Sequence, residues 1–481
     1  MAEQRLEEIR KIRFEKAKKL RDLGINPYPS KAPSKHEPID QAISSIGKVA
    51  TVVGRIWGIR EHGNCCFADL KDETGKIQLF LQKKKLGEKF KLVSLLDIGD
   101  FVWAKGEVVK TKAGEISLDV SDHGILTKSI RPIPSTWHGL KDMEERYRQR
   151  YVDLLLNDEL KELLKKKTVF WHSMRDFLYE KGFLEVETPV LENTVGGADA
   201  KPFVTHHDAL DIDLYLRISM GELWQKRLMV AGFEKTFEIG RQFRNEGISR
   251  EHLQDYTQME FYWAYADYED SMKLVEEMYK YVAKKAFGKL KFKINDFDVD
   301  LSKPWKRIDY TKTLLEKTGV DISKTTTKEL KEKLTEFKIP FDKKAAKGRL
   351  IDTFWKTIRK KIAGPVFLTG HPVEVSPLAK RKEDAPEFTE RYQIIVAGSE
   401  MGNGYSELND PADQAERFKQ QQKMRDEGDS EAQMHDKDFV KALEYGMPPV
   451  TGFGVSERLF SFLANKSIRE TVLFPLLKPK K

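Results

Sequence analysis

The pattern of hydrophobic and polar positions divides the chain into two regions of different character. Between residues 48 and 128, short runs such as VATVVGRIWGIR, CCFADLKD and GKIQLFLQ alternate and are separated by turn-forming segments such as DETG and KAG. This pattern predicts several short strands, which with a helix before Gly99 form a small five-stranded barrel of the OB type. Before the barrel, residues 2–23 carry apolar residues at near-helical spacing, and Gly24 is placed to end that helix.

The rest of the chain mixes long helical patterns with strand-like segments. A proline-containing linker is expected to enter a helix, and the lysine runs of two later helices predict a solvated face. The strands VFLTG, YQIIVAG and VTGFGV are apolar enough for a core. The expected segments are the linker 131–151, helices at 158–181 and 271–288, strands within 207–265, and the two lysine-rich helices within 325–363.

Composition narrows the class of protein. The chain has 481 residues, 40% hydrophobic content, a formal charge of +8 and a pI of about 9.0, which is compatible with a nucleic-acid partner. Its two cysteines, Cys65 and Cys66, are adjacent, so neither a disulfide framework nor zinc-ligand spacing is indicated, and a reducing cytoplasm is expected. The charged N-terminus lacks a signal-peptide pattern, and no apolar run has the roughly 20 residues of a membrane span, so no membrane association is expected.

An unusual polar pattern runs through FRNEGISREHLQDYTQMEFYWAY, residues 243–265. Because alternate residues of a strand share a face, Arg244 and Glu246 are expected on one face with Tyr256, Glu260 and Tyr262 of the second strand. Phe and Trp residues occupy the opposite face. Arginine beside carboxylates favours a lined site for a planar anion such as phosphate, although a surface salt-bridge ladder has the same pattern.

Two further segments concentrate chemistry. EMGNGYSELND, residues 400–410, places oxygen-bearing side chains beside glycines, as expected for Mg²⁺ or a cationic substrate or for a simple turn. GFGVSERLFSFL places Arg458 on a helix after a glycine-rich strand end, as expected for a ligand contact or for a packed strand–helix junction. In the barrel, Phe67 with Arg55, Arg60, Gln78 and Glu115 predicts a face that stacks single-stranded bases, unless Phe67 belongs to the core.

These segments together resemble the class II lysyl-tRNA synthetases over nearly the whole chain. The resemblance is carried by LRDLGINPYP, RYRQRYVDLL, KGFLEVETPVL, GGADAKPFVTHHDALDIDLYLRIS, ELWQKRLMVAGFEKTFEIGRQFRNEGIS, EFYWAYADY, PVEVSPLAKR and GNGYSELNDPADQAERF. It implies an α+β chain with an N-terminal helix and OB-fold anticodon-binding domain at 1–142. The implied catalytic domain, an antiparallel sheet flanked by helices, follows at 143–481, with a helical insertion at about 289–364.

The resemblance also implies roles for single residues. Catalytic roles are implied for Arg244, Glu246 and Arg458, and ATP contacts for Arg244, Glu246, His252, Tyr256, Glu400 and Arg458. Lysine contacts are implied for Glu222, Glu260, Tyr262, Asn403, Tyr405 and Glu407. Mg²⁺ ligands are implied at Glu400, Glu407 and Gln393, and anticodon contacts at Arg55, Phe67, Gln78 and Glu115.

The implied activity is that of a lysine–tRNA ligase, which forms lysyl-adenylate from ATP and L-lysine and transfers lysine to tRNA(Lys). Such an enzyme needs no general base, since the lysine carboxylate is already ionised near neutral pH. Several carboxylates suit a substrate with two ammonium groups and reject aspartate. A homodimer is implied through the segment KGFLEVETP, which resembles motif 1 of the class.

Two positions depart from the family pattern. Gln393 stands where a second acidic metal ligand is usual, which predicts weaker metal binding. The segment before Arg458 is one residue shorter than usual, which predicts a local backbone adjustment. Two other hypotheses remain open from the residues, a related ligase for another amino acid or for lysylation of a protein, and a catalytically silent nucleic-acid-binding relative.

Overall fold

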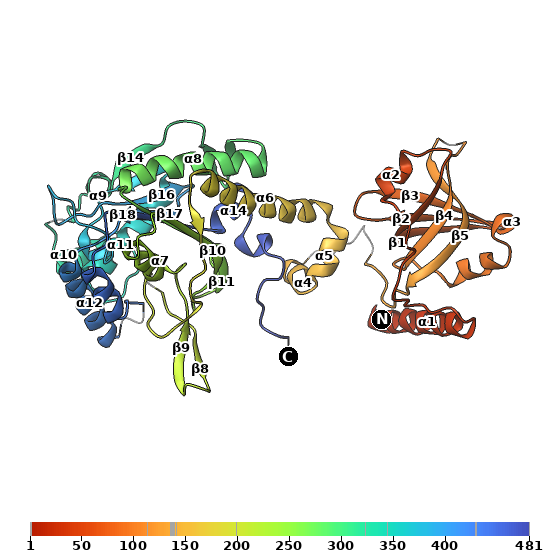
Figure 1. Cartoon of the computed structure of the whole chain (residues 1–481), viewed down its shortest axis with the longest axis horizontal. Helices are drawn as coiled ribbons and strands as arrows, with labels where there is room; N and C mark the ends of the chain where they lie inside the picture. Colours follow the sequence, from red (N-terminus) through yellow and green to blue (C-terminus); the bar gives the residue numbers. More distant parts are fainter. Residues whose placement is uncertain are drawn as a thin grey trace. The chain divides into compact units, whose positions relative to one another are not determined.

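The computed structural model describes residues 2–480 except 113, 135–139, 141, 199, 323, 344, 429 and 430. Its internal contacts divide the chain into two compact units, Met1–Leu156 and Asn157–Lys481 (Figure 1). The first unit includes the short helices α4, Met143–Arg148, and α5, Arg150–Leu156, which follow the boundary expected at residue 142. Residues 135–139 and 141 of the expected linker lie outside the described residues.

In the described part of the first unit, five strands close into a barrel in the order β1-β2-β3-β5-β4. Only the β3–β5 pairing in this order is parallel. Alternate residues such as Val52, Ala68 and Leu118 point inward and are buried, so the predicted OB-type barrel is confirmed. The elements are α1 Ala2–Asp22, α2 Ile39–Ile43, β1 Val49–His62, β2 Cys65–Lys71, β3 Lys76–Gln82, α3 Lys83–Leu86, η1 Gly87–Leu95, β4 Phe101–Lys110 and β5 Ile116–Thr127.

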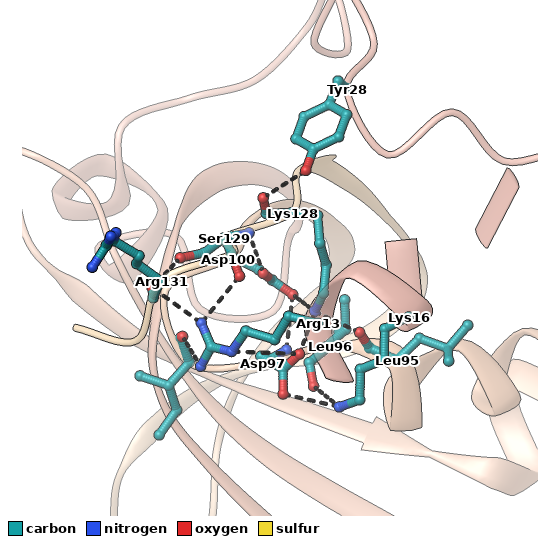
Figure 2. A network of polar contacts seen from close by, with 11 residues as sticks. Arg13, Lys16, Tyr28, Leu95, Leu96, Asp97, Asp100, Lys128, Ser129 and Arg131 are labelled. Atoms are coloured by element: carbon teal, nitrogen blue, oxygen red, sulfur yellow. Dashed lines mark hydrogen bonds and ion pairs between the residues drawn. The ribbon is translucent and has the colours of Figure 1, made fainter. Parts of the chain in front are cut away.

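A buried polar network attaches α1 to the barrel (Figure 2). The Lys128 ammonium is fully buried and lies 2.5 Å from Asp97 and 2.7 Å from Asp100. From α1, Lys16 pairs with Asp97 at 2.9 Å. The Arg13 guanidinium donates to the backbone carbonyl of Ile98, before β4, and to those of Ser129 and Arg131, after β5. These bonds satisfy the buried charges and hold the N-terminal helix against the barrel.

The second unit contains a mixed sheet whose described strands follow the order β14-β15-β16-β17-β18-β11-β10-β6. The strands from β15 to β10 pair antiparallel, as expected from the resemblance. The two edge strands differ from that expectation, because β14 joins β15 and β6 joins β10 in parallel. Parallel pairing is possible there because residues 310–365 separate β14 from β15, and residues 186–234 separate β6 from β10.

The sheet lies in unit 2 among helices that precede, interrupt and follow it (Figure 1). Its strands are β6 Leu184–Glu185, β10 Lys235–Phe243, β11 Asp255–Ala264, β14 Lys306–Asp309, β15 Val366–Thr369, β16 Arg391–Val396, β17 Ser399–Ser406 and β18 Val450–Ser456. Smaller sheets contain β7 Leu191–Glu192, β8 Val204–His207, β9 Ile212–Leu216, β12 Lys291–Ile294 and β13 Phe297–Asp300. The helices are α6 Asp158–Glu180, α7 Glu222–Val230, α8 Tyr268–Phe287, α9 Tyr310–Thr318, α10 Thr327–Glu336, α11 Lys347–Ile358, η2 Arg359–Lys361, η3 Val373–Val375, α12 Pro411–Asp426, α13 Lys437–Glu444, α14 Arg458–Leu463 and η4 Ile468–Thr471.

One face of the sheet packs against α8, which in turn packs against α6. Buried apolar residues of the hairpin, such as Phe237, Met259 and Phe261, belong to this core. The lysine-rich helices α10 and α11 bury Leu330, Leu334 and their neighbours in a separate cluster, so their lysines remain at the surface as predicted. Among the described residues, no helix is long and apolar enough to cross a membrane.

Candidate active site

The polar face of the sheet carries two rows of residues that run across neighbouring strands. In one row, Glu238 pairs with Glu260, Glu260 with Gly454, Gly454 with Asn403, and Asn403 with Gln393. In the second row, Tyr262 pairs with Gly452, and Gly452 with Tyr405. Directly paired residues of a sheet present their side chains on the same face. The chain therefore gathers oxygen-bearing side chains from β10, β11, β16 and β17 on one surface.

Two glycines of β18 leave space in the middle of these rows. A Cβ atom at Gly452 would lie 2.3 Å from Glu407 Oε1 and 2.6 Å from Tyr262 Cε1. A Cβ atom at Gly454 would lie 3.0 Å from Glu260 Cγ. Because any larger residue would displace these groups, the glycine-rich strand is needed for the acidic side chains to come together.

Arg244 lies at one end of this surface. Strand β10 ends at Phe243, so Arg244 and Glu246 occupy the following loop rather than the strand face that the alternation predicted. The Arg244 N–H still bonds to Gln254 O at 2.8 Å, and its guanidinium lies 5.9 Å from the centroid of the Tyr256 ring. Burial lowers the pKa of Arg244, but Tyr256 and several carboxylates outweigh this effect and raise it, so the guanidinium stays charged.

Other predicted ATP-contacting residues lie nearby. His252 pairs with Ser249 Oγ at 2.7 Å, and its pKa is lowered by burial and by the charge of Arg458. Arg458 begins α14 and donates to the backbone carbonyl of Glu400. Burial raises the pKa of Tyr256. Two arginines and Glu400 thus share one electrostatic environment, which suits a polyanion with a bound cation.

The segment before Arg458 contains a buried acid. Glu457 is fully buried, its carboxylate accepts from Thr257 N–H at 3.1 Å, and Lys167 of α6 donates to it. Its own N–H donates to Thr257 O at 2.9 Å. This link between α6, β11 and α14 fixes the backbone next to Arg458.

An acidic cluster, Glu222, Glu260 and Glu407, lies at the other end of the surface. All three side chains are buried. Glu260 accepts from Met220 N–H at 3.0 Å and from Tyr262 OH at 3.1 Å, and Tyr405 OH donates to Glu222. Burial, with the charge of Glu222, raises the pKa of Glu260 to about 7. Such a cluster suits a ligand that brings positive charge.

The chain already places one cation in the acidic cluster. The Lys226 ammonium lies 2.7 Å from Glu222 Oε1 and 2.5 Å from Glu407 Oε2, and its side chain is 1% exposed. Burial lowers the pKa of Lys226, but these two carboxylates outweigh that effect and raise it. Lys226 was not among the residues singled out from the sequence. The spacing of Glu222 and Lys226, four residues apart on a helix, is the signal that could have identified it.

The predicted metal ligands do not all come together. Glu400 is at the start of β17, while Glu407 follows its end, about 23 Å away along an extended strand. Glu407 is engaged by Lys226, so its predicted metal role is not supported by its position. Gln393, two strands from β18, faces His371 Nε2 at 3.3 Å. No group of three or more His, Cys, Asp or Glu residues that could hold a metal was found among the described residues.

A single carboxylate nevertheless fits one way in which proteins hold Mg²⁺. This ion often uses one or two carboxylates and completes its coordination with water and substrate phosphates. Glu400 lies at the end of the surface that carries Arg244 and Arg458, and its charge acts on Arg244. Arg359, which follows α11, approaches the same carboxylate at 3.8 Å. These residues fit an ion shared with a polyphosphate better than an ion enclosed by protein.

On the barrel, Phe67 lies on the outer face, where its ring stacks on Phe80 with centroids 4.8 Å apart. Gln78 donates to Glu115 at 3.1 Å and pairs with Asp69, two residues from Phe67. The interpretation of Phe67 as a core residue is wrong, because the inward positions of β2 are Cys66, Ala68 and Leu70.

Two arginines of β1 differ in their relation to this face. Arg60 pairs directly with Phe67 and makes a two-bond contact with Asp69 at 2.9 and 3.1 Å. Arg55 pairs with Lys71 further along the strand, and its guanidinium lies 4.3 Å from the Phe101 ring centroid. The structure thus brings together Phe67, Gln78 and Glu115 with Arg60 and leaves Arg55 apart.

Comparison with known proteins gives matches to both units. Residues 142–478 match a family model described as class II tRNA synthetases (D, K and N), and residues 50–126 match an OB-fold nucleic acid binding domain. A lysine–tRNA ligase of Carboxydothermus hydrogenoformans is 45% identical, with all of both chains covered. Those of Thermosipho africanus and Thermoanaerobacter pseudethanolicus are 44% and 45% identical, with 98% and 99% of this chain and 97% of each relative covered.

The family model covers more than half of the chain, and the relatives align over nearly their whole length. The order of the domains also agrees, since the barrel precedes the mixed sheet in the chain. The chain therefore belongs to the class II tRNA synthetases of the D, K and N group.

Proposed function

We propose that this protein is a lysine–tRNA ligase, which activates L-lysine with ATP to lysyl-adenylate, releases pyrophosphate and transfers lysine to the 3′ end of tRNA(Lys). Three relatives with that name, 44–45% identical over nearly the whole chain, support the proposal. The observation that carries it is the buried acidic cluster on the same surface as Arg244. A substrate with two ammonium groups and a carboxylate fits this arrangement, with its carboxylate directed toward the arginine end.

The first step brings two anions together. The lysine carboxylate attacks the α-phosphate of ATP, a bond to the attacking oxygen forms, and the bond to pyrophosphate breaks. Arg244 is positioned to neutralise the charge at phosphorus, and its raised pKa keeps it charged. Because the attacking carboxylate is already ionised, alignment and electrostatics carry the step and no base is needed.

The proposed residue assignments combine the family resemblance with the two ends of the surface. ATP is assigned to Arg244, Glu246, His252, Tyr256, Glu400 and Arg458. Lysine is assigned to Glu222, Glu260, Tyr262, Asn403, Tyr405 and Glu407. Mg²⁺, when bound, supplies charge neutralisation to the phosphates, and Glu400 is the carboxylate that would hold it, with Gln393 as a neutral neighbour.

Transfer requires recognition of the tRNA. The outer face of the barrel, with Phe67, Gln78 and Glu115, is proposed to contact the anticodon, since base stacking on an exposed aromatic is a common mode for OB folds. Arg60 is added to this set because it pairs with Phe67. Arg55 is retained only as a contact further along the same face.

A homodimer through the segment at 181–191 is also proposed. Several apolar side chains in and near this segment are at least 40% exposed, and such a surface is typical of a protein interface. They are Leu184, Val190, Leu191, Val204, Leu210 and Ile212. We place the enzyme in the cytoplasm, where its tRNA substrate is used and where adjacent free cysteines are kept reduced.

The assay that tests the proposal is amino-acid-dependent exchange of pyrophosphate into ATP across all twenty amino acids, followed by charging of tRNA(Lys). Lysine alone should support exchange, and Glu260→Gln should reduce it strongly, whereas Glu276→Gln on α8 should not. Exchange with another amino acid would identify a ligase of different specificity. Absence of any exchange would point to a nucleic-acid-binding relative without catalysis.

A further inference from the structure

Lys226 contacts the acidic cluster, but the proposed mechanism does not use it. Its ammonium bridges Glu222 and Glu407, which come from α7 and from the end of β17. Its position is also limited by two aromatic rings, because the ammonium lies 5.5 Å from the Tyr405 centroid and 5.9 Å from that of Phe439. Two carboxylates and two aromatic rings thus surround the ammonium.

The formal charges of these groups can be counted. Three carboxylates in a buried cluster repel one another, and an unpaired buried charge is strongly unfavourable. When all three carboxylates are ionised, above the pKa of about 7 of Glu260, the Lys226 ammonium reduces the net charge of the cluster from three negative charges to two. A bound lysine brings two ammonium groups to the cluster, while the negative charge of its carboxylate, or of the adenylate phosphate after activation, lies toward the Arg244 end. The cluster with Lys226 therefore balances the two ammonium groups of lysine, whereas the ionised cluster without Lys226 carries one negative charge more than they offset.

We propose that Lys226 is a positioning residue for lysine selection, which holds Glu222 and Glu407 in place and sets the charge of the acidic cluster to match a substrate with two ammonium groups. The inference rests on the lysine placement proposed above. A different role, in which Lys226 merely fills the substrate's place and leaves when lysine binds, disagrees with its burial to 1% exposure on a helix that packs against α13.

The experiment compares Lys226→Met with Lys226→Arg. Methionine keeps the length of the side chain and removes the charge, while arginine keeps the charge and can bridge two carboxylates. The matched control is Lys280→Met, because Lys280 and Glu276 form an ion pair with the same four-residue spacing on α8. For each folded variant, the KM for lysine and for ATP is measured by pyrophosphate exchange and the lysine Kd by calorimetry.

We expect Lys226→Met to raise the KM and Kd for lysine at least tenfold while the KM for ATP stays within twofold. Lys226→Arg should recover most of the loss, and Lys280→Met should behave as the unmodified enzyme. Lysine constants within twofold in Lys226→Met, or an equal loss for ATP, would overturn the inference. Glu260→Gln distinguishes failure of the proposed lysine placement from failure of the Lys226 proposal alone. Normal lysine binding in that variant refutes the lysine placement itself and with it the role of Lys226.

A structure of the unmodified enzyme with lysine provides a second test that does not depend on the folding of any variant. The Lys226 ammonium should remain bound to both carboxylates while the substrate ammonium takes the remaining oxygens. Displacement of Lys226 from either carboxylate by the substrate would overturn the inference.

Discussion

The buried pair of Lys167 and Glu457 allows a quantitative prediction. Glu457 is fully buried next to Arg458, and Lys167 donates both to its carboxylate and to Thr471 O. The perturbation is Lys167→Met, which preserves most of the side-chain volume and removes the ammonium. Among the described residues, the Thr257 N–H is then the remaining partner of the Glu457 carboxylate.

The expected loss follows from the burial of the two groups. Removal of one partner of a buried ion pair costs about 3–5 kcal/mol, because a buried charge is left uncompensated. Lys167 is 15% exposed and Glu457 keeps its bond to Thr257, so the lower limit of about 3 kcal/mol applies. At about 2 °C per kcal/mol for a unit of this size, Tm should fall by about 6 °C.

Scanning calorimetry measures this effect. The transition of the second unit is the one whose midpoint ATP raises, since a ligand stabilises the unit that binds it. Lys161→Met on the same helix removes a surface pair with Asp158 and should change Tm by less than about 1 °C. Lys167→Met/Glu457→Gln should recover part of the loss, because the uncompensated charge is gone. A decrease in Tm of less than about 2 °C in Lys167→Met would refute the reasoning.

Three other measurements test the site. Burial and the charge of Glu222 raise the pKa of Glu260 to about 7, so its carboxylate is protonated below that pH. Lysine binding should therefore tighten from about pH 6 to about pH 8. In a calorimetric titration, Glu260→Gln should lack this increase in lysine affinity. Phe67→Ala should raise the KM for tRNA about 5- to 150-fold through lost stacking, and an unchanged KM would contradict the anticodon assignment, whereas pyrophosphate exchange should stay normal. Gln393→Glu adds a carboxylate on the strand beside β17, so the Mg²⁺ concentration for half-maximal exchange should fall severalfold, and no change would show that Gln393 lies outside the metal site.

Alternation alone predicted much of the hairpin. The opposite faces of β10 and β11 follow from a period of two, and Glu238 indeed pairs with Glu260, and Phe237 with Phe261. The position of Arg244 did not follow, because Asn245 and Gly247 indicate a turn but not the residue at which the strand ends. The barrel strands could also be predicted from the sequence, because turn residues separate short alternating segments.

Contacts between distant segments were beyond the sequence pattern. Lys226 meets Glu407 across α7 and the end of β17, and Gly452 lies between Tyr262 and Tyr405 only because β18 inserts between β11 and β17. The resemblance supplied the names of the residues but not the charge balance of the cluster. The separation of Glu400 from Glu407 likewise appeared only when both ends of β17 were placed.

The order of strands in the sheet has a consequence for synthesis of the chain on the ribosome. β11 ends at Ala264, but its neighbour β18 begins at Val450, so an elongating chain needs about 10–40 s to supply the missing edge. During that interval the backbone amides and carbonyls along one side of β11 have no strand partner. An unpaired edge of this kind can bind chaperones or form incorrect strand pairs with another chain. The barrel strands, which all lie within residues 49–127, are complete long before then and can close early. Nascent-chain quality control should therefore concentrate on the period between the emergence of β11 and that of β18.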